Sequence, residues 1–115
     1  MRLATVLFML GLKLRWNAWR SAGFRSKLKR VDRVIVIRTE DGKQARSYIF
    51  RNDTVRDHKG SDPHATAEMV WIESGIAVKA MLSSNPLDNF SAIGRGDLAI
   101  HGNLQDAFWF SELVG

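Results

Sequence analysis

Cysteine is absent from this chain of 115 residues. Disulfide bonds, thiolate metal sites and cysteine nucleophiles are therefore excluded. Only two prolines occur, and the sequence contains no low-complexity tract or internal repeat. The chain is long enough for one domain with its own hydrophobic core and too short for two.

Residue patterns typical of catalysis or metal binding are also scarce. The three histidines, His58, His64 and His101, are not spaced as ligands on one helix, and the loop between the first two is a weak signal for zinc. Residues 61–64 include serine, aspartate and histidine, but three triad residue types within one turn do not easily adopt triad geometry. We therefore predict that the protein is not an enzyme and has no catalytic residue, no metal site and no cofactor.

Acidic residues are missing from the first 31 positions, which hold eight lysines and arginines. The rest of the chain holds nine bases and twelve acids, a net charge of −3, so the overall charge of +5 hides an asymmetry. A basic segment on a mildly acidic domain suggests an anionic partner, although a solvated face that aids solubility is the alternative. We divide the chain into an N-terminal apolar and basic helix with its connector, residues 1–30, and a domain over residues 31–115.

The apolar run of residues 3–12 predicts a helix that neither spans a membrane nor is cleaved. A transmembrane helix needs about 20 apolar residues, and a secretory signal needs small residues where Lys13, Arg15 and Trp16 follow instead. Helical periodicity continues to Trp19. Tryptophan beside bases at the end of an apolar run is typical of a helix at a membrane interface. It is equally typical of a helix that packs on a core with a basic outer face, and the sequence leaves both open.

We predict that residues 1–30 dock the domain on an anionic membrane surface. The protein would then be cytoplasmic and peripheral on the inner face of a membrane. The apolar side chains would supply binding that resists salt, and the bases would supply binding that fades as salt rises. The predicted membrane-contacting residues are Phe8, Arg15, Trp16, Trp19, Arg20, Arg25, Lys27, Lys29 and Arg30.

Nucleic acid is the competing partner for this segment. Aromatic side chains alternate with lysine and arginine at Trp16, Trp19 and Phe24. Such a segment can stack on nucleobases and bind phosphates. We disfavour nucleic acid because residues 3–12 prefer hydrocarbon and because the rest of the chain is net acidic.

The first half of the domain predicts strands joined by tight turns. Residues 34–37 are all β-branched and favour a strand. Asp41-Gly42 is a strong hairpin signal before a second strand over residues 47–50. Asn52-Asp53 predicts another turn, followed by a short third strand around Val55. Residues 24–30 are predicted to be a connector.

The second half predicts two more strands and helices that cover the sheet. Residues 65–73 alternate as a strand, with Ala67, Met69 and Trp71 on one face. Ser74 is a candidate N-cap for a helix through Leu82, and residues 87–93 predict short turns. A last strand over residues 98–101 leads to Asn103, which can cap a final helix over residues 103–114. The fold class is α+β, a mainly antiparallel sheet of about five strands with helices packed on one face.

The final helix carries Phe108, Trp109 and Phe110 in succession. Neighbouring residues on a helix point about 100° apart, so three adjacent aromatics cannot all face one flat core. Two interpretations stay open: all three are core residues, or one flank of the helix borders a ligand.

Several motifs in this order resemble the sterol carrier protein family, type two. They are the Asp41-Gly42 hairpin, an aromatic second strand with Tyr48 and Phe50, and a strand–serine–helix unit over residues 68–82. The most specific motif is Gly-x-Leu-x-Ile-x-Gly-Asn over residues 96–103, which leads into an apolar helix. The resemblance extends from Thr39 to the C-terminus.

The resemblance implies a tunnel between sheet and helices that binds an apolar lipid ligand such as a sterol, a fatty acyl chain or an isoprenoid-like lipid. Family members bind such ligands without catalysis, and some bacterial relatives are accessory factors in lipid-quinone synthesis. A structural or protein-interaction module with no ligand of its own is the alternative, and the sequence carries no signal of oligomeric state. The residues expected to border the ligand are Tyr48, Phe50, Met69, Trp71, Val78, Met81, Phe90, Ile93, Phe108 and Phe110.

Overall fold

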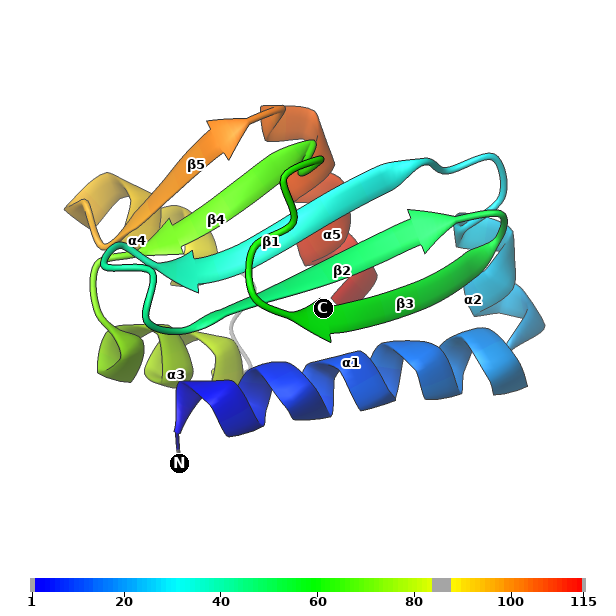
Figure 1. Ribbon diagram of the computed structural model, residues 1–115, viewed down its shortest axis with the longest axis horizontal. Helices are drawn as coiled ribbons and strands as arrows, with labels where there is room; N and C mark the ends of the chain where they lie inside the picture. Colours follow the sequence, from blue (N-terminus) through cyan, green and yellow to red (C-terminus); the bar gives the residue numbers. More distant parts are fainter. Residues whose placement is uncertain (1, 84–87, 115) are drawn as a thin grey trace.

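A single five-stranded sheet forms the centre of the molecule, in the order β3-β2-β1-β4-β5 (Figure 1). The computed structural model describes residues 2–83 and 88–114. Every neighbouring pair of strands is antiparallel except β1 and β4, which are parallel. The strands are β1 (Arg33–Thr39), β2 (Ala45–Arg51), β3 (Thr54–Lys59), β4 (Ala67–Trp71) and β5 (Leu98–Gly102). The predicted α+β class and mainly antiparallel sheet are confirmed.

Helices cover one face of this sheet, and an irregular segment crosses the other (Figure 1). α1 packs against β2 and β3, and α5 packs against β1, β4 and β5. α3 contacts both α1 and β4. No helix in the described part of the chain has the length and apolar character needed to cross a bilayer. The helices are α1 (Leu3–Arg20), α2 (Ala22–Lys27), α3 (Ser74–Leu82), α4 (Asp88–Arg95) and α5 (Leu104–Val114).

The β-branched run of β1 is buried on both faces because this strand lies at the centre of the sheet. Ile35 and Ile37 join the cluster under the helices, whereas Val34 and Val36 point the other way and are also buried. The predicted face of β4 is confirmed, since Ala67, Met69 and Trp71 are all buried under the helices.

Residues 60–66 cross the face of the sheet that carries no helix (Figure 1). The hydroxyl of Ser47 donates to the Gly60 carbonyl at 2.7 Å and accepts from the Asp62 amide at 2.9 Å. The Thr66 hydroxyl donates to the Val34 carbonyl at 3.1 Å. These bonds hold the segment onto the sheet and bury the outer side of β1.

Three local predictions were wrong. Part of the predicted connector is the helix α2, because the buried Phe24 and Leu28 anchor this segment to the core. Ser21 caps its first turn by accepting a hydrogen bond from the Phe24 amide at 3.1 Å. Ser74 is the first residue of α3, since the extended Glu73 occupies the N-cap position. The short turns predicted over 87–93 are the helix α4, anchored by the buried Ala92; residue 87 lies outside the described residues.

The predicted cap of the final helix is confirmed. The Asn103 side chain accepts a hydrogen bond from the Asp106 amide at 3.2 Å and so satisfies one of the free donors of the first turn of α5.

Candidate functional site

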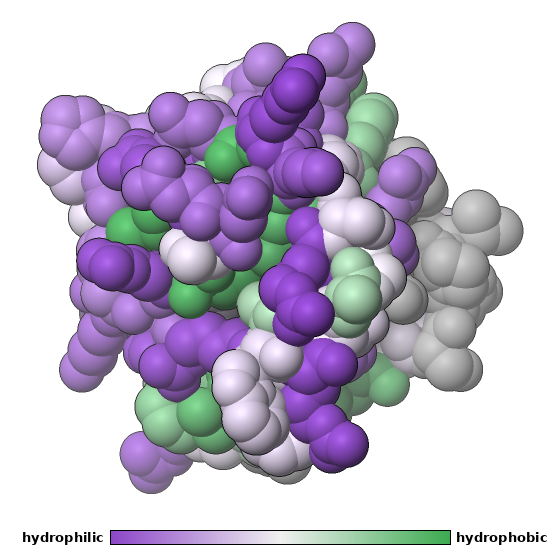
Figure 2. Space-filling view, turned by 90° about the vertical axis from the view of Figure 1, so that its right-hand side faces the viewer, coloured by the Kyte–Doolittle hydropathy of each residue, from purple (hydrophilic) through white to green (hydrophobic). Residues whose placement is uncertain are grey.

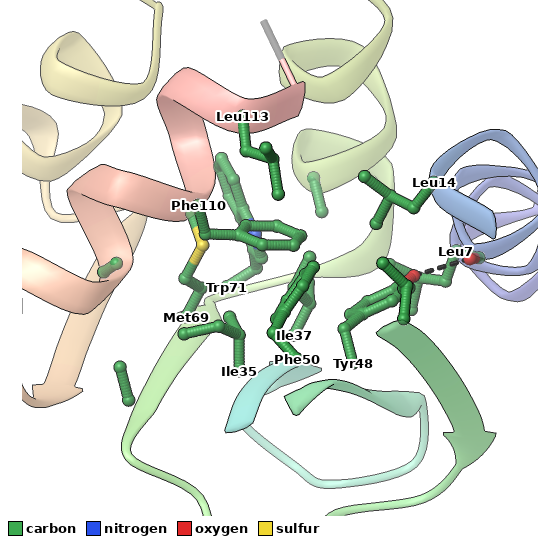
Figure 3. Packing of buried hydrophobic residues seen from close by; sticks show 14 of the residues in the cluster. Leu7, Leu14, Ile35, Ile37, Tyr48, Phe50, Met69, Trp71, Phe110 and Leu113 are labelled. Atoms are coloured by element: carbon green, nitrogen blue, oxygen red, sulfur yellow. Dashed lines mark hydrogen bonds between the residues drawn. The ribbon is translucent and has the colours of Figure 1, made fainter. Parts of the chain in front are cut away.

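A cluster of large apolar side chains fills the space between the sheet and the helices (Figure 3). Five of the predicted ligand-lining residues meet there: Tyr48 and Phe50 from β2, Met69 and Trp71 from β4, and Phe110 from α5. None of the five is more than 5% exposed. The Phe110 ring lies 5.6 Å from the Tyr48 ring and 5.9 Å from the Phe50 ring, between centroids. The structure therefore brings together half of the predicted set.

The other five predicted lining residues lie farther out. Val78 and Met81 of α3 are partly buried and pack against the edge of the cluster. Phe108 of α5 is partly buried, and Ile93 of α4 is 36% exposed at the surface. The side chain of Phe90 lies outside the described residues.

The three consecutive aromatics of α5 occupy different surroundings. Phe110 points into the cluster (Figure 3). Trp109 meets the Phe50 ring edge-on at 4.9 Å, and the guanidinium of Arg33 lies 4.6 Å from the Trp109 ring centre. Arg33 is held in turn by Asp106, with Nε 2.8 Å from Oδ1. Trp109 and Phe110 thus both contact other aromatic rings, and Trp109 also contacts an arginine 76 positions earlier in the chain.

Two buried polar atoms interrupt the apolar cluster. The hydroxyl of Tyr48 donates to the Leu7 carbonyl of α1 at 2.5 Å (Figure 3), and burial raises the pKa of this phenol well above its ordinary value. The indole Nε1 of Trp71 is buried and has no hydrogen-bond acceptor among the described residues. A buried donor without a partner is uncommon in native proteins, so Trp71 marks the position in the cluster where an acceptor could bind.

A buried carboxylate holds α1 to the sheet. The side chain of Asp57, on β3, is fully buried, with Oδ2 2.6 Å from Nη2 of Arg46. Nε of Arg15, on α1, lies 3.2 Å from the other oxygen, Oδ1. This group could not be predicted from the sequence, because alternation along so short a strand does not reveal which residues lie beneath a helix.

The outer side of α1 carries an exposed apolar strip. Its residues, which we call the α1 ridge, are Phe8, Met9, Leu12, Trp16 and Trp19. Each is at least 45% exposed, and Trp19 is 72% exposed. The inner side holds Leu3, Leu7 and Leu14, each 1% exposed. α1 is therefore a core helix on one side and an exposed apolar helix on the other.

The predicted membrane-contacting bases have different surroundings. Arg15 is engaged by Asp57, and Arg25 donates to the Ala18 and Trp19 carbonyls at 3.1 and 2.8 Å, which caps the end of α1. The guanidinium of Arg20 lies over the ring of Trp16, 5.2 Å from its centre. The remaining three bases are exposed at the end of α2 and beyond it: Lys27, Lys29 and Arg30.

Comparison with solved structures identifies the architecture. The chain superimposes on "UbiJ-SCP2 Ubiquinone synthesis protein" with a TM-score of 0.70 at 17% identity, covering 96% of this chain and 93% of that one. Sterol Carrier Protein 2 from Yarrowia lipolytica gives a TM-score of 0.64 at 14% identity, over 96% of this chain and 88% of that one. This is the sterol carrier protein 2 fold.

Sterol Carrier Protein-2 like-3 from Aedes aegypti also has this fold, with a TM-score of 0.57, 17% identity, and coverage of 92% and 93% of the two chains. No protein-family model matches the chain, and no curated protein matches it by sequence. The resemblance stated from the motifs is therefore confirmed at the level of fold.

The end of this sterol-carrier fold where α1 meets α2 carries an apolar patch at its surface (Figure 2). Figure 2 looks onto that end and shows hydrophobic residues, in green, between hydrophilic side chains. Several partly buried apolar residues pack against the cluster at its margin, among them Ala18, Val31, Trp109 and Val114. Partly buried apolar side chains thus border the cluster, and one end of the molecule shows an apolar patch at its surface.

The histidines lie away from this cluster. His58 is 3.1 Å from Asp62, and His101 is 3.8 Å from Glu68, each pair at the surface. Within residues 2–83 and 88–114, no group of three or more histidine, aspartate or glutamate side chains is placed to hold a metal ion.

Proposed function

We propose that this protein binds an apolar lipid, of the sterol, fatty acyl or isoprenoid class, and transfers it at a membrane surface without catalysis. The observation that carries the proposal is the sterol carrier protein 2 fold, in which the helices cover an aromatic sheet face that the predicted lining residues share. A membrane is the natural place of exchange, because a lipid of these classes partitions out of water into bilayers.

Trp71 suggests which end of the ligand would lie deepest. Its buried N–H lacks an acceptor among the described residues, and leaving such a donor unpaired costs about 1–3 kcal/mol. The cluster that holds Trp71 is made of hydrophobic side chains. A neutral oxygen, such as a hydroxyl, an ester carbonyl or a quinone carbonyl, suits this donor better than a carboxylate, whose charge would be desolvated without a counter-ion.

The ligand would enter at the apolar patch on the end of the molecule shown in Figure 2. The tight packing of the five innermost residues means that binding would require the helices to shift outward. A ligand of this kind buries most of its surface and therefore needs space inside the cluster. A small outward movement of α5 or α1 would supply that space.

Displacement of a fluorescent fatty acid tests ligand binding directly. We expect a long-chain alcohol or methyl ester to displace the probe more effectively than the hydrocarbon of equal length, because only the first two carry an acceptor for Trp71. In Trp71→Phe this difference should disappear while circular dichroism stays unchanged. Native mass spectrometry of protein purified from its own host would identify the ligand class. An empty mass spectrum together with no probe binding would contradict the proposal.

A second candidate function is an accessory module with no ligand of its own. It is favoured by the close packing of Tyr48, Phe50 and Phe110, which leaves these rings nearly unexposed. The similarity to a protein named for ubiquinone synthesis supports a role of this kind in lipid-quinone synthesis. Failure of probe binding combined with capture of a partner protein through the folded domain would favour this second candidate.

A further inference from the structure

The two edge strands of the sheet differ in how they are protected from other chains. β3 carries Arg56, Asp57 and Lys59 and packs against α1. Charged side chains and a covering helix are two common ways of keeping an edge strand from pairing with another strand. β5, at the opposite edge (Figure 1), contains no lysine, arginine, aspartate, glutamate or proline. The β5 edge therefore carries none of the charges that block such pairing.

The backbone of β5 faces alternately toward β4 and away from it. The Ile72 amide donates to the Asp97 carbonyl and the Asn103 amide donates to the Thr66 carbonyl, both at 2.9 Å. In an antiparallel pair, residues that bond to the neighbouring strand alternate with residues whose backbone groups point away. Positions 97, 99, 101 and 103 therefore face β4. The three residues whose N–H and C=O groups point away from β4 are Leu98, Ile100 and Gly102.

The spacing of these three residues makes β5 complementary to itself. An antiparallel second copy of β5 centred on Ile100 places Ile100 opposite Ile100, and Leu98 opposite Gly102. Because all of these residues point their backbone groups outward, the pairs are of the hydrogen-bonded kind and supply about six backbone hydrogen bonds. Between them, Ala99 lies opposite His101 of the second copy, so a small side chain meets a larger one.

No like charges lie opposite each other in this register. Asp97, which pairs with Arg95 of its own copy at 2.9 Å, lies opposite Asn103 of the second copy. Like charges directly opposite on neighbouring strands destabilise a sheet. The register of β5 with itself is therefore free of this penalty.

Exposed apolar side chains border both ends of β5. Ile72, whose amide bonds to the Asp97 carbonyl, is 52% exposed, and Leu104, which follows the strand, is 49% exposed. The two-fold axis at Ile100 brings Leu104 of one copy to the end of the interface where Ile72 of the other copy lies. The pairing thus places exposed apolar residues of both copies at each end of the joined strands.

We propose that two copies of this chain associate through β5, antiparallel about a two-fold axis at Ile100, so that their sheets join into one continuous sheet. The occupant of the edge is a second copy because β5 satisfies its own outward backbone groups in a single register without opposing charges. The pairing uses backbone groups at the edge of the sheet. It goes beyond the proposed function and is tested without any ligand.

Sedimentation equilibrium of the full chain measures the association. We expect a dimer that dissociates on dilution. Ile100→Pro removes the outward N–H at the two-fold axis without removing a bond to β4, and it should raise the dimer dissociation constant by at least about a hundredfold. The matched control is Ile100→Ala, which removes the side chain, keeps the N–H and should retain the dimer.

A second control removes an outward N–H from the other edge of the sheet. The Gly60 amide donates to the Ala45 carbonyl of β2, so the amide of the preceding Lys59 points away from the sheet. Lys59→Pro should leave the dimer intact. Circular dichroism checks that each variant is folded.

The register is tested by disulfide formation, since the wild-type chain has no cysteine. Residues 99 and 101 of opposite copies have Cα atoms about 5 Å apart in this register, a distance that a disulfide bridges. Either residue lies diagonally from its own counterpart, about 7–8 Å away, which is too far for a disulfide without backbone movement. Ala99→Cys and His101→Cys should therefore each remain reduced alone and form a disulfide-linked dimer when mixed under mild oxidation.

Two outcomes would overturn the β5 interface. One is a monomer at every concentration together with no disulfide in the mixture of the two cysteine variants. The other is a dimer that persists in Ile100→Pro and forms no disulfide in that mixture, because its interface then lies elsewhere on the molecule. If Ile100→Pro does not fold, the cysteine mixture decides by itself, since both of its positions are exposed or half-exposed on the β5 edge.

Discussion

Gly11 of α1 lies directly over the carboxylate of Asp57 on β3. A Cβ at position 11 would be 2.8 Å from Cγ of Asp57 and in still closer contact with Oδ2. The absence of a side chain lets the helix approach the sheet at the place where Arg15 and Arg46 bind the same carboxylate. This contact sets the position of α1 and, with it, which side of the helix faces outward.

Gly11→Ala should therefore destabilise the fold. Asp57 is fully buried and held by two arginines, so it cannot move aside easily. We expect a loss of about 1–3 kcal/mol in the free energy of unfolding, even though alanine favours a helix. Urea denaturation measures it. Gly94→Ala in α4 is the control, since a Cβ there meets nothing within 4 Å and should be neutral or stabilising. Equal effects of the two variants would contradict this account of Gly11.

Asp57→Asn should weaken the attachment of α1 to β3. The substitution keeps the shape of the side chain and removes the charge that compensates Arg46, which is largely buried. Breaking a buried pair from one side leaves an uncompensated charge, so we expect a loss of about 3 kcal/mol. Asp32→Asn removes the carboxylate from the exposed Arg51–Asp32 pair and should change stability little. Thermal denaturation compares them, and similar melting temperatures for both variants would contradict the prediction.

Tyr48 is the only tyrosine of the chain, so tyrosinate absorbance reports on it alone. Burial, assisted by the charge of Asp57, raises the pKa of Tyr48 above its ordinary value. The unfolded chain therefore loses this proton above about pH 10 while the folded chain keeps it, and stability falls as the pH rises.

Tyr48→Phe should cost about 1 kcal/mol at neutral pH, because the hydrogen bond to the Leu7 carbonyl is lost. The stability of the variant should also fall less than that of the wild type as the pH rises above about 10, because phenylalanine has no proton to lose. Denaturation at neutral pH and at about pH 11 tests both statements. Ionisation of Tyr48 near pH 10 in the folded protein would show that the phenol is accessible to solvent.

His58 should titrate above its ordinary range. Its pKa is raised first by the Lys59 carbonyl and then by the Asp62 carboxylate, both of which favour the protonated ring. The contribution to stability is therefore complete below about pH 6.5 and is lost as the pH rises through the folded-state pKa. Nuclear magnetic resonance should show a lower pKa for His58 in Asp62→Asn, with His58→Gln used to assign the signal. An unchanged pKa in Asp62→Asn would remove the carboxylate from this explanation.

Replacement of the histidines should leave ligand binding intact. His58, His64 and His101 are exposed and lie outside the apolar cluster. Each alanine variant should bind the fluorescent fatty acid with wild-type affinity. A large loss in any one of them would point to a metal site or a catalytic role in place of the carrier function.

The strands and turns of this protein could be predicted from local sequence because their determinants are local. β-branched side chains favour the extended backbone over residues 34–37, and Asp41-Gly42 and Asn52-Asp53 supply the left-handed residues that tight turns require, with Gly42 at φ 74° and Asn52 at φ 54°. Asn103 caps α5 through a residue three positions away. The helix α4 was missed because its anchor, Ala92, is small and gives a weak periodic signal.

Side-chain alternation along β4 also identified which of its residues are buried, but not what covers them. A strand has only two faces, so Ala67, Met69 and Trp71 necessarily share one. That Phe110 packs against Tyr48 and Phe50, that the Arg33 guanidinium lies over Trp109, and that the Trp71 N–H lacks an acceptor among the described residues depend on segments far apart in the chain.

The composition of residues 1–31 by itself determined that this segment is apolar and basic, without one acidic residue. The composition could not decide between a core helix and an interfacial helix. The apolar residues of α1 lie on nearly every side of the helix, so their spacing does not indicate which side faces the core. Only the tertiary structure decided this. Gly11 and Asp57 set the side of α1 that packs on the sheet, and the opposite side, with Trp16 and Trp19, is left exposed.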